Sequence, residues 1–334
     1  MRPFAYTKPA TAADAVRAIA AAGPGTRFLA GGTTLYDLMK LNVETPSSIV
    51  DVNSLPELSG FDTSGSSELV FGALSRMSDV AADGRLVRDY PALSESLWGA
   101  ASQQLRNMAS LGGNLLQRTR CAYFRGGEPF ACNKRKPGSG CAARDGINRG
   151  HALLGGSETC IAVYPGDWAV ALSAFDAKVD VLGPKGQRTI PVEHLHREPG
   201  ATPDVETVLE PNELILRIRV PVTPLGRAST YHKIRDRESY AFALASAAVA
   251  LQMDGDTVRD ARIAIGGLAT RPWRARAAEQ TLVGRSLTAQ TARAAGDAAL
   301  QGAKARDDNR FRIELGARTV ADALMIAKQR ALRR

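Results

Sequence analysis

The chain has 334 residues, of which 44% are hydrophobic, and a formal net charge of +9 at pH 7. This length and apolar content allow a large core and two domains of ordinary size. No run of eighteen apolar residues occurs, so we expect no membrane span. The N-terminus lacks a basic segment followed by an apolar one, so we expect a cytoplasmic protein without its own export signal, periplasmic only if a signal-bearing partner carries it.

The positive charge is concentrated around the cysteines. Eight Arg and Lys residues lie between positions 118 and 149, where the acidic residues are Glu128 and Asp145. A second basic group, including Lys328 and Arg330, lies in a predicted C-terminal helix, where cations complement the helix dipole. Because clustering matters more than total charge, we expect no nucleic-acid binding.

The chain opens with a helix and a strand that lead into paired glycines. The helix begins at Thr11 and ends near Gly23, and a short apolar strand covers residues 26–30. The sequence GGTT follows at positions 31–34, and a helical apolar pattern starts directly after it. Free backbone N–H groups at such a helix start form an anion site, although two glycines alone are also typical of an ordinary turn.

A second pair of glycines lies within the run ASLGGN of residues 109–114. The backbone approaches a phosphate closely only where side chains are absent. Two such loops on one chain favour a ligand with two phosphates, with one loop on each side of it. The pattern G-x-G-x-x-G does not follow the first strand, so Rossmann-type binding of a nicotinamide nucleotide is not predicted.

All the cysteines lie between this second pair and Asp167, with the spacing C-x10-C-x8-C-x18-C. A structural zinc site usually contains C-x2-C, and a chain of this size needs no disulfides. An iron–sulfur cluster accepts thiolates from separate loops, and the neighbouring cations would offset its negative charge. The pattern favours a [4Fe–4S] cluster and leaves zinc and free thiols as alternatives. The cysteines are Cys121, Cys132, Cys141 and Cys160.

The rest of the chain continues as strands and then helices. Alternating apolar residues predict strands over residues 178–182 and 213–220, and residues 221–226 form a natural linker. A hairpin with a tight turn at Asp254-Gly255 and helices over residues 277–282, 288–303 and 311–331 complete the chain.

No catalytic residue is assigned from the sequence. The four histidines are scattered singly, and a lone histidine is more often structural than a ligand, so none receives a role. We expect three large aromatic residues to lie in the core rather than to stack on a ligand. These are Trp168, Tyr240 and Trp273.

Four motifs carry a resemblance to a known family. They are AGGTTL at residues 30–35, QLRNMASLGGN at 104–114, PGD at 165–167 and YHKIRDR at 231–237. With them, the chain resembles the flavin-binding middle subunit of the xanthine dehydrogenase family of molybdenum hydroxylases. The cysteine insertion at about residues 117–163 is similar to that of the subgroup with an additional [4Fe–4S] cluster, found in bacterial three-subunit aldehyde oxidoreductases.

The resemblance implies an α+β fold with two domains. Residues 1–222 would form a vanillyl-alcohol-oxidase-type FAD-binding domain of two α/β lobes, interrupted by the cysteine insertion. Residues 223–334 would form an α+β domain like the C-terminal domain of the CO dehydrogenase flavoprotein.

The resemblance also implies which residues bind cofactors. The two glycine loops would supply amides and hydroxyls to the FAD phosphates, and Asp167 would bind the ribityl chain. Lys233 would reach the isoalloxazine, although a salt bridge with Asp236 or Glu238 is an equal alternative. The residues assigned to FAD are Leu29, Ala30, Gly31, Gly32, Thr33, Thr34, Leu35, Ala109, Ser110, Gly112, Gly113, Asn114, Asp167 and Lys233, and those assigned to the cluster are Cys121, Cys132, Cys141 and Cys160.

The implied function is electron transfer within a heterotrimer. A large subunit with a molybdenum cofactor would oxidise an aldehyde, a small subunit with two [2Fe–2S] clusters would pass on the electrons, and this chain would deliver them through FAD to an external acceptor. The alternatives are a stand-alone FAD-dependent oxidase, the FAD subunit of a xanthine, aromatic acyl-CoA or CO hydroxylase, and a basic iron–sulfur protein that binds nucleic acid. The last alternative does not explain the two glycine loops.

Overall fold

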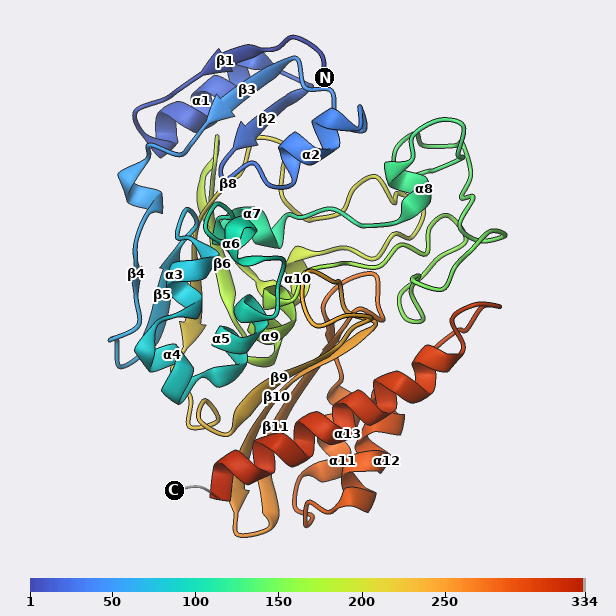
Figure 1. Ribbon diagram of the computed structural model, residues 1–334. Coiled ribbons are helices and arrows are strands. Elements are labelled where there is room, and N and C mark those ends of the chain that lie inside the picture. Colours follow the sequence, from blue (N-terminus) through green and yellow to red (C-terminus); the bar gives the residue numbers. More distant parts are fainter. Residues whose placement is uncertain (333–334) are drawn as a thin grey trace.

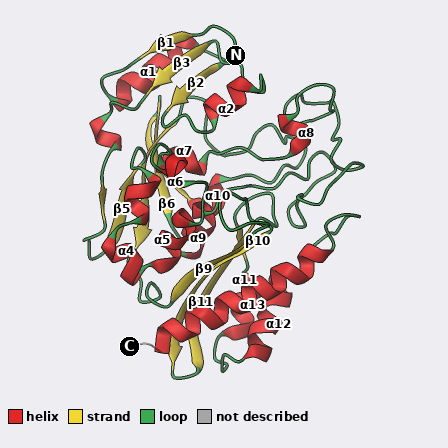
Figure 2. Ribbon diagram, viewed as in Figure 1, coloured by secondary structure: helices red, strands yellow, loops and turns green. Residues whose placement is uncertain are grey.

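A computed structural model describes residues 1–332 and contains three sheets, with helices between and beside them (Figures 1 and 2). Two of the sheets belong to two lobes built mainly from the first two thirds of the chain, and the third belongs to a C-terminal layer. This mixed α and β architecture agrees with the predicted fold class. None of the described helices is long and apolar enough to cross a membrane.

The first lobe is a parallel sheet with two helices (Figure 1, top). Its α1 helix starts at Thr11, whose side chain accepts a hydrogen bond from the Asp14 amide at 3.1 Å, and ends at Gly23, where φ is +73°. The strand order is β1-β3-β2, and both neighbours of β3 run parallel to it. The elements of this lobe are β1 (Ala5–Thr7), α1 (Ala12–Ala22), β2 (Thr26–Leu29), α2 (Leu35–Lys40) and β3 (Ser48–Asp51).

The second lobe is an antiparallel sheet covered by short helices. Its strand order is β4-β5-β8-β6-β7, so the central strand is β8, the last of the five in the sequence. Trp168 is fully buried beneath this sheet and meets the ring of Phe71 edge to face, with the centroids 5.7 Å apart. The elements are η1 (Pro56–Leu58), β4 (Phe61–Asp62), β5 (Glu68–Gly72), α3 (Met77–Ala81), α4 (Gly84–Asp89), α5 (Pro91–Trp98), α6 (Gln103–Arg106), α7 (Leu111–Leu115), α9 (Trp168–Ala174), β6 (Lys178–Gly183), β7 (Gly186–Pro191), α10 (Val192–Leu195) and β8 (Leu214–Pro221).

The C-terminal layer is a four-stranded antiparallel sheet with the order β12-β11-β10-β9. Its central strand β10 is buried on both faces: Ala248 and Ala250 belong to the core of the second lobe, whereas Ala247 and Val249 belong to the core beneath the C-terminal helices. Side chains of a strand alternate between faces, so one strand joins both cores. The elements are β9 (Ser229–Ile234), β10 (Ala245–Asp254), β11 (Thr257–Gly266), β12 (Trp273–Arg274), α11 (Arg276–Leu282), α12 (Ala289–Ala299) and α13 (Phe311–Leu332).

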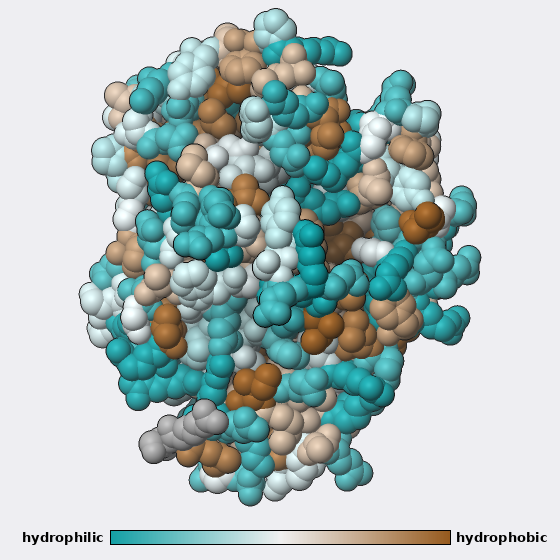
Figure 3. Space-filling view, viewed as in Figure 1, coloured by the Kyte–Doolittle hydropathy of each residue, from teal (hydrophilic) through white to brown (hydrophobic). Residues whose placement is uncertain are grey.

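The cysteine-bearing segment, residues 117–163, is mostly irregular loop with one short helix, α8 (Ala122–Arg125). It projects beside the first lobe (Figure 1, green). The face seen in Figure 3 is largely hydrophilic, with small separate hydrophobic patches. The buried cluster that includes Phe124 and Cys132 of this segment is small, so the segment has no large core of its own.

The elements expected from the sequence mostly occur where they were predicted. The hairpin at Asp254 and the three final helices are present. Trp168 lies in the core as predicted, and Trp273 is partly buried. The prediction for Tyr240 was wrong, because its side chain is 56% exposed and its φ is +54°. It lies in a loop between two strands, where no second layer covers it.

Candidate functional site

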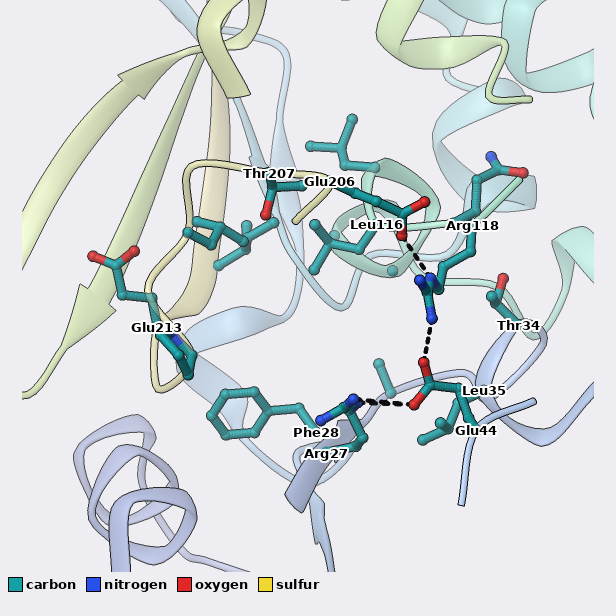
Figure 4. Close-up of a pocket in the computed structure, with 18 of the residues that line it drawn as sticks. Arg27, Phe28, Thr34, Leu35, Glu44, Leu116, Arg118, Glu206, Thr207 and Glu213 are labelled. Atoms are coloured by element: carbon teal, nitrogen blue, oxygen red, sulfur yellow. Dashed lines mark hydrogen bonds and ion pairs between the residues drawn. The ribbon is translucent and has the colours of Figure 1, made fainter. Parts of the chain in front are cut away.

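A cavity of about 830 Å³ lies between the two lobes, within the range typical of cofactor sites (Figure 4). Both predicted glycine loops line it, although they are far apart in the sequence. The predicted FAD residues on its wall are Ala30, Gly31, Gly32, Thr33, Thr34, Leu35, Ser110, Gly112 and Gly113. Five others lie outside its wall: Leu29, Ala109, Asn114, Asp167 and Lys233.

The first loop, residues 31–34, has the geometry of an anion site. Among residues 1–332, no acceptor receives the backbone amides of this loop, which stand before helix α2. Gly32 has φ +73°, a conformation that favours glycine. A Cβ on Gly31 would lie 2.0 Å from the carbonyl oxygen of Met108, so the two loops touch backbone to backbone. Free amides at the start of a helix suit a phosphate group.

The second loop lines the cavity, but three of its backbone amides are already hydrogen-bonded within the protein. The Leu111 amide donates to Ser75 O at 3.0 Å, and the Gly112 amide donates to Ala73 O at 2.8 Å. The Gly113 amide donates to the Ser110 hydroxyl at 3.3 Å. These three amides already have protein acceptors, because helix α7 packs against the segment after β5; the supply of amides by this loop to the FAD phosphates stays a prediction. Its glycines allow close packing within the protein, because a Cβ would lie 3.0 Å from Ala73 Cβ at Gly112 and 2.8 Å from Ser110 Oγ at Gly113.

A chain of ion pairs crosses the cavity (Figure 4). Arg27 pairs with Glu44 at 3.1 Å, Glu44 pairs with Arg118, and Arg118 pairs with Glu206 at 2.5 Å. Lys134 extends the chain to Glu206 at 2.9 Å. Burial opposes ionisation of Glu206, but Lys134 and Arg118 outweigh it and lower the pKa of that carboxyl group. The network joins the first lobe to the cysteine-bearing segment.

A second buried cluster contains two of the predicted FAD residues. Asp167 lies at the start of α9 and accepts hydrogen bonds from Tyr231 Oη at 2.6 Å and Lys233 Nζ at 2.9 Å. Lys233 therefore pairs neither with Asp236 nor with Glu238, because its strand turns the ammonium inward. Burial raises the pKa of Asp167, and the Lys233 charge opposes that rise. A carboxylate offers about four lone-pair positions, so Asp167 can accept further hydrogen bonds.

The four cysteines, which come from separate loops, converge on one small cavity beside the larger one. Cys132 and Cys141 lie opposite each other in an isolated antiparallel bridge. All four thiols are free, and burial raises the pKa of Cys121 to about 11 and also raises the pKa of Cys160. The wall between the two cavities includes Lys134 and Cys160, which line both.

Two histidines near these cavities were missed by the sequence analysis. His151 Nε2 lies 3.2 Å from Cys121 Sγ, and burial lowers the pKa of His151. His196 lines the larger cavity, hydrogen-bonds Leu115 O at 2.8 Å, and has its pKa lowered to about 4 by burial. Single histidines carry no spacing signal, so only the folded chain identifies these contacts.

Comparisons with known proteins agree with this geometry. Residues 2–223 match the family described as the FAD binding domain in molybdopterin dehydrogenase, and residues 229–325 match the CO dehydrogenase flavoprotein C-terminal domain. The chain belongs to this FAD-binding family. It is thus an FAD-binding oxidoreductase subunit with the domain types that the sequence predicts.

Relatives of this FAD-binding family match over nearly the whole chain. The FAD-binding subunit of aldehyde oxidoreductase from Escherichia coli is 45% identical, covering 99% of this chain and all of the relative. The carbon monoxide dehydrogenase medium chain from Hydrogenophaga pseudoflava is 28% identical over 89% of this chain and 86% of that protein. A solved structure of carbon monoxide dehydrogenase from the same organism superposes with a TM-score of 0.77 and 28% identity, covering 99% of each chain. The descriptions of the two matching families mention the flavin and make no mention of an iron–sulfur cluster.

Proposed function

We propose that this chain is the FAD and [4Fe–4S] subunit of a molybdenum-dependent aldehyde oxidoreductase. The observation that carries the proposal is the 45% identity, over the full length of both chains, to an FAD-binding subunit of aldehyde oxidoreductase. In this proposal a large subunit holds the molybdenum cofactor and a small subunit holds two [2Fe–2S] clusters. Bound FAD supplies the chemistry of accepting electrons singly and releasing them singly or in pairs to an external acceptor.

We further propose how this chain's residues hold FAD. The amides of residues 31–34 receive the pyrophosphate, supported by their lack of protein acceptors within the described chain and by their place before α2. Asp167 accepts from the ribityl hydroxyls with lone pairs that Tyr231 and Lys233 leave free. The Lys233 ammonium supplies positive charge at the flavin end and lies buried, with 6% of its side chain exposed. The FAD-binding domain in this proposal covers residues 1–222, and the second domain covers residues 223–334.

The proposed cluster depends on the cysteines alone. Thiolates on one zinc ion stand about 3.8 Å apart, as follows from Zn–S bonds of about 2.3 Å in a tetrahedron. Among residues 1–332, no group of three or more His, Cys, Asp or Glu side chains is spaced for a single metal ion. A [4Fe–4S] cluster takes four cysteine ligands, and the four thiols that line one cavity from different loops supply that number.

Copurification from the native host tests the class of the enzyme. We expect a complex with molybdenum, about one FAD per copy of this chain, and aldehyde-oxidising activity. An active chain without a molybdenum-bearing partner would instead favour a stand-alone flavin oxidase.

Two substitutions in that complex test the two cofactor sites separately. Gly113→Val should reduce FAD occupancy at least about tenfold, since a Cβ on Gly113 would lie 2.8 Å from Ser110 Oγ and the larger side chain would displace this part of the cavity wall. Gly84→Val is the matched control, because Gly84 faces open space. Cys141→Ser should remove the iron of this chain, whereas Ala142→Ser next to it should not. Iron that remains unchanged in Cys141→Ser would contradict the fourfold ligation.

A further inference from the structure

His151 is a buried side chain whose polar contact is made with a cysteine. Its exposed fraction is 6%, and its Nε2 lies 3.2 Å from Cys121 Sγ. Within the described residues, Nδ1 has no hydrogen-bond partner. The ring also lies beside Tyr123, with the centroids 6.2 Å apart, and Tyr123 lines the cysteine cavity. The imidazole thus has one polar contact, which points at the sulfur.

The position of His151 is fixed from the C-terminal layer. Its carbonyl oxygen accepts hydrogen bonds from Arg312 at 2.7 Å and from Asn309 at 3.3 Å. Its amide donates to Asn148 O at 2.9 Å, and Asn148 exchanges two hydrogen bonds with Asp308, of 3.0 and 3.2 Å. These bonds hold the backbone on both sides of the ring, and close packing around the buried ring restricts its rotation away from Cys121.

We infer that the Nε2–H group of His151 donates a hydrogen bond to the Cys121 thiolate and so raises the reduction potential of the cluster proposed above. This inference rests on the proposed function. A neutral imidazole carries one N–H, and a thiolate acceptor at Nε2 selects the tautomer with the proton on that nitrogen. Reduction adds negative charge to the cluster, so a donor to its sulfur stabilises the reduced form more than the oxidised form. Hydrogen bonds to sulfur are among the features that set cluster potentials.

His151 is a positioning residue in this inference and not a metal ligand. Four cysteines already supply the complete ligand set of a [4Fe–4S] cluster. A side chain that hydrogen-bonds a metal ligand in this way orients that ligand and tunes the metal centre.

The test is a redox titration of the intact complex, followed by the electron paramagnetic resonance signal of the cluster on this chain. His151→Phe keeps a flat ring and removes the donor, whereas His151→Gln keeps an N–H donor. His194→Phe is the matched control, since His194 is exposed and lies outside both cavities. We expect His151→Phe to lower the ratio of reduced to oxidised cluster about tenfold at a fixed solution potential, which is 59 mV for a one-electron couple. His151→Gln should restore part of this loss, and His194→Phe should change nothing.

Iron content separates the two hypotheses. A wild-type chain without iron would refute the proposed cluster, whereas a wild-type cluster with an unchanged potential in His151→Phe would refute only the role of His151. Loss of iron from both His151 variants would also overturn the inference, because it would make the ring a ligand or an assembly residue.

A measurement on the unsubstituted complex covers the case in which His151→Phe alone fails to assemble. After labelling histidine with nitrogen-15, pulsed electron paramagnetic resonance of the reduced cluster should detect one weakly coupled histidine nitrogen. A strongly coupled nitrogen would mean direct ligation, and no coupling would mean no contact; either result would overturn the inference.

Discussion

Burial shifts the pKa of two titratable side chains at the candidate sites, Cys121 and His196. It raises the pKa of the Cys121 thiol to about 11 and lowers the pKa of His196 to about 4. Both groups are therefore neutral near pH 7 until a cation or ligand changes their surroundings. At the cysteines, thiolates form when a metal centre is bound, which couples metal binding to proton release.

The pKa of His196 predicts how stability depends on pH. Its folded-state pKa lies below the unfolded value of about 6.5, so the unfolded chain binds more protons between pH 6.5 and pH 4. The stability of the folded protein is therefore complete above pH 6.5 and falls as the pH drops toward 4. From pH 7 to pH 5 we expect a loss of about 2 kcal/mol from this residue.

Denaturant unfolding of wild type and His196→Gln at both pH values measures this contribution. The glutamine still donates to Leu115 O but does not titrate. The loss of unfolding free energy between pH 7 and pH 5 should therefore be about 2 kcal/mol smaller in His196→Gln than in wild type. His194→Gln, at an exposed position, should behave like wild type. Equal pH dependence of wild type and His196→Gln would show that His196 is accessible to protons in the folded state.

At the scale of elements, helix α2 connects the first glycine loop to the cysteine-bearing segment. Its Asp37 pairs with Arg120 at 3.1 Å and with Arg125 at 2.8 Å. Its Leu38 is buried against Phe124 and Cys132. A single short helix thus has the first glycine loop at its start and contacts the cysteine-bearing segment along its length.

Asp37→Asn should therefore weaken FAD binding although Asp37 lies outside the cavity wall. The ion pairs are partly exposed, so each contributes at most about 1 kcal/mol, and we expect the FAD dissociation constant to rise about two- to fivefold. Flavin released on dilution, followed by fluorescence, measures the constant. Asp297→Asn removes a comparable exposed pair on α12 and should leave it unchanged. An unaltered dissociation constant in Asp37→Asn would mean that the first glycine loop keeps its shape without these ion pairs to the cysteine-bearing segment.

For the whole molecule, the sequence predicted the features that are encoded locally and missed contacts between residues far apart in the chain. Paired glycines and strand periodicity are encoded within a few residues, so both loops and most elements were predicted from the sequence. The pairing of Lys233 with Asp167 joins residues 66 positions apart, and the sequence offered Asp236 and Glu238 as nearer partners. The contact of His151 with Cys121 depends on a backbone held by α13, so no local signal could reveal it.

Arg312 is one of the residues through which the C-terminal layer holds the cysteine-bearing segment. It is 1% exposed and donates to the carbonyl oxygens of Leu244, Arg149, His151 and Gly267. Arg312→Met should destabilise the protein by about 3 kcal/mol or more, because each buried carbonyl left without a donor costs roughly 1–3 kcal/mol.

Thermal unfolding of Arg312→Met measures this cost. Arg310→Met is the control, because it changes an exposed neighbour. The midpoint should fall in Arg312→Met and stay near wild type in Arg310→Met. Similar midpoints in all three proteins would mean that other contacts suffice to attach the cysteine segment.

The central place of β8 in the second lobe also constrains the order of events during translation. Strands β5 and β6 are neighbours in that sheet only through β8, so the sheet stays open until residues 214–221 have left the ribosome. The cysteine-bearing segment leaves the ribosome earlier, before the sheet of the second lobe is complete. The FAD site is therefore expected to form after synthesis of β8, and a pause in translation before that strand would prolong the time during which the four thiols are open to oxidation.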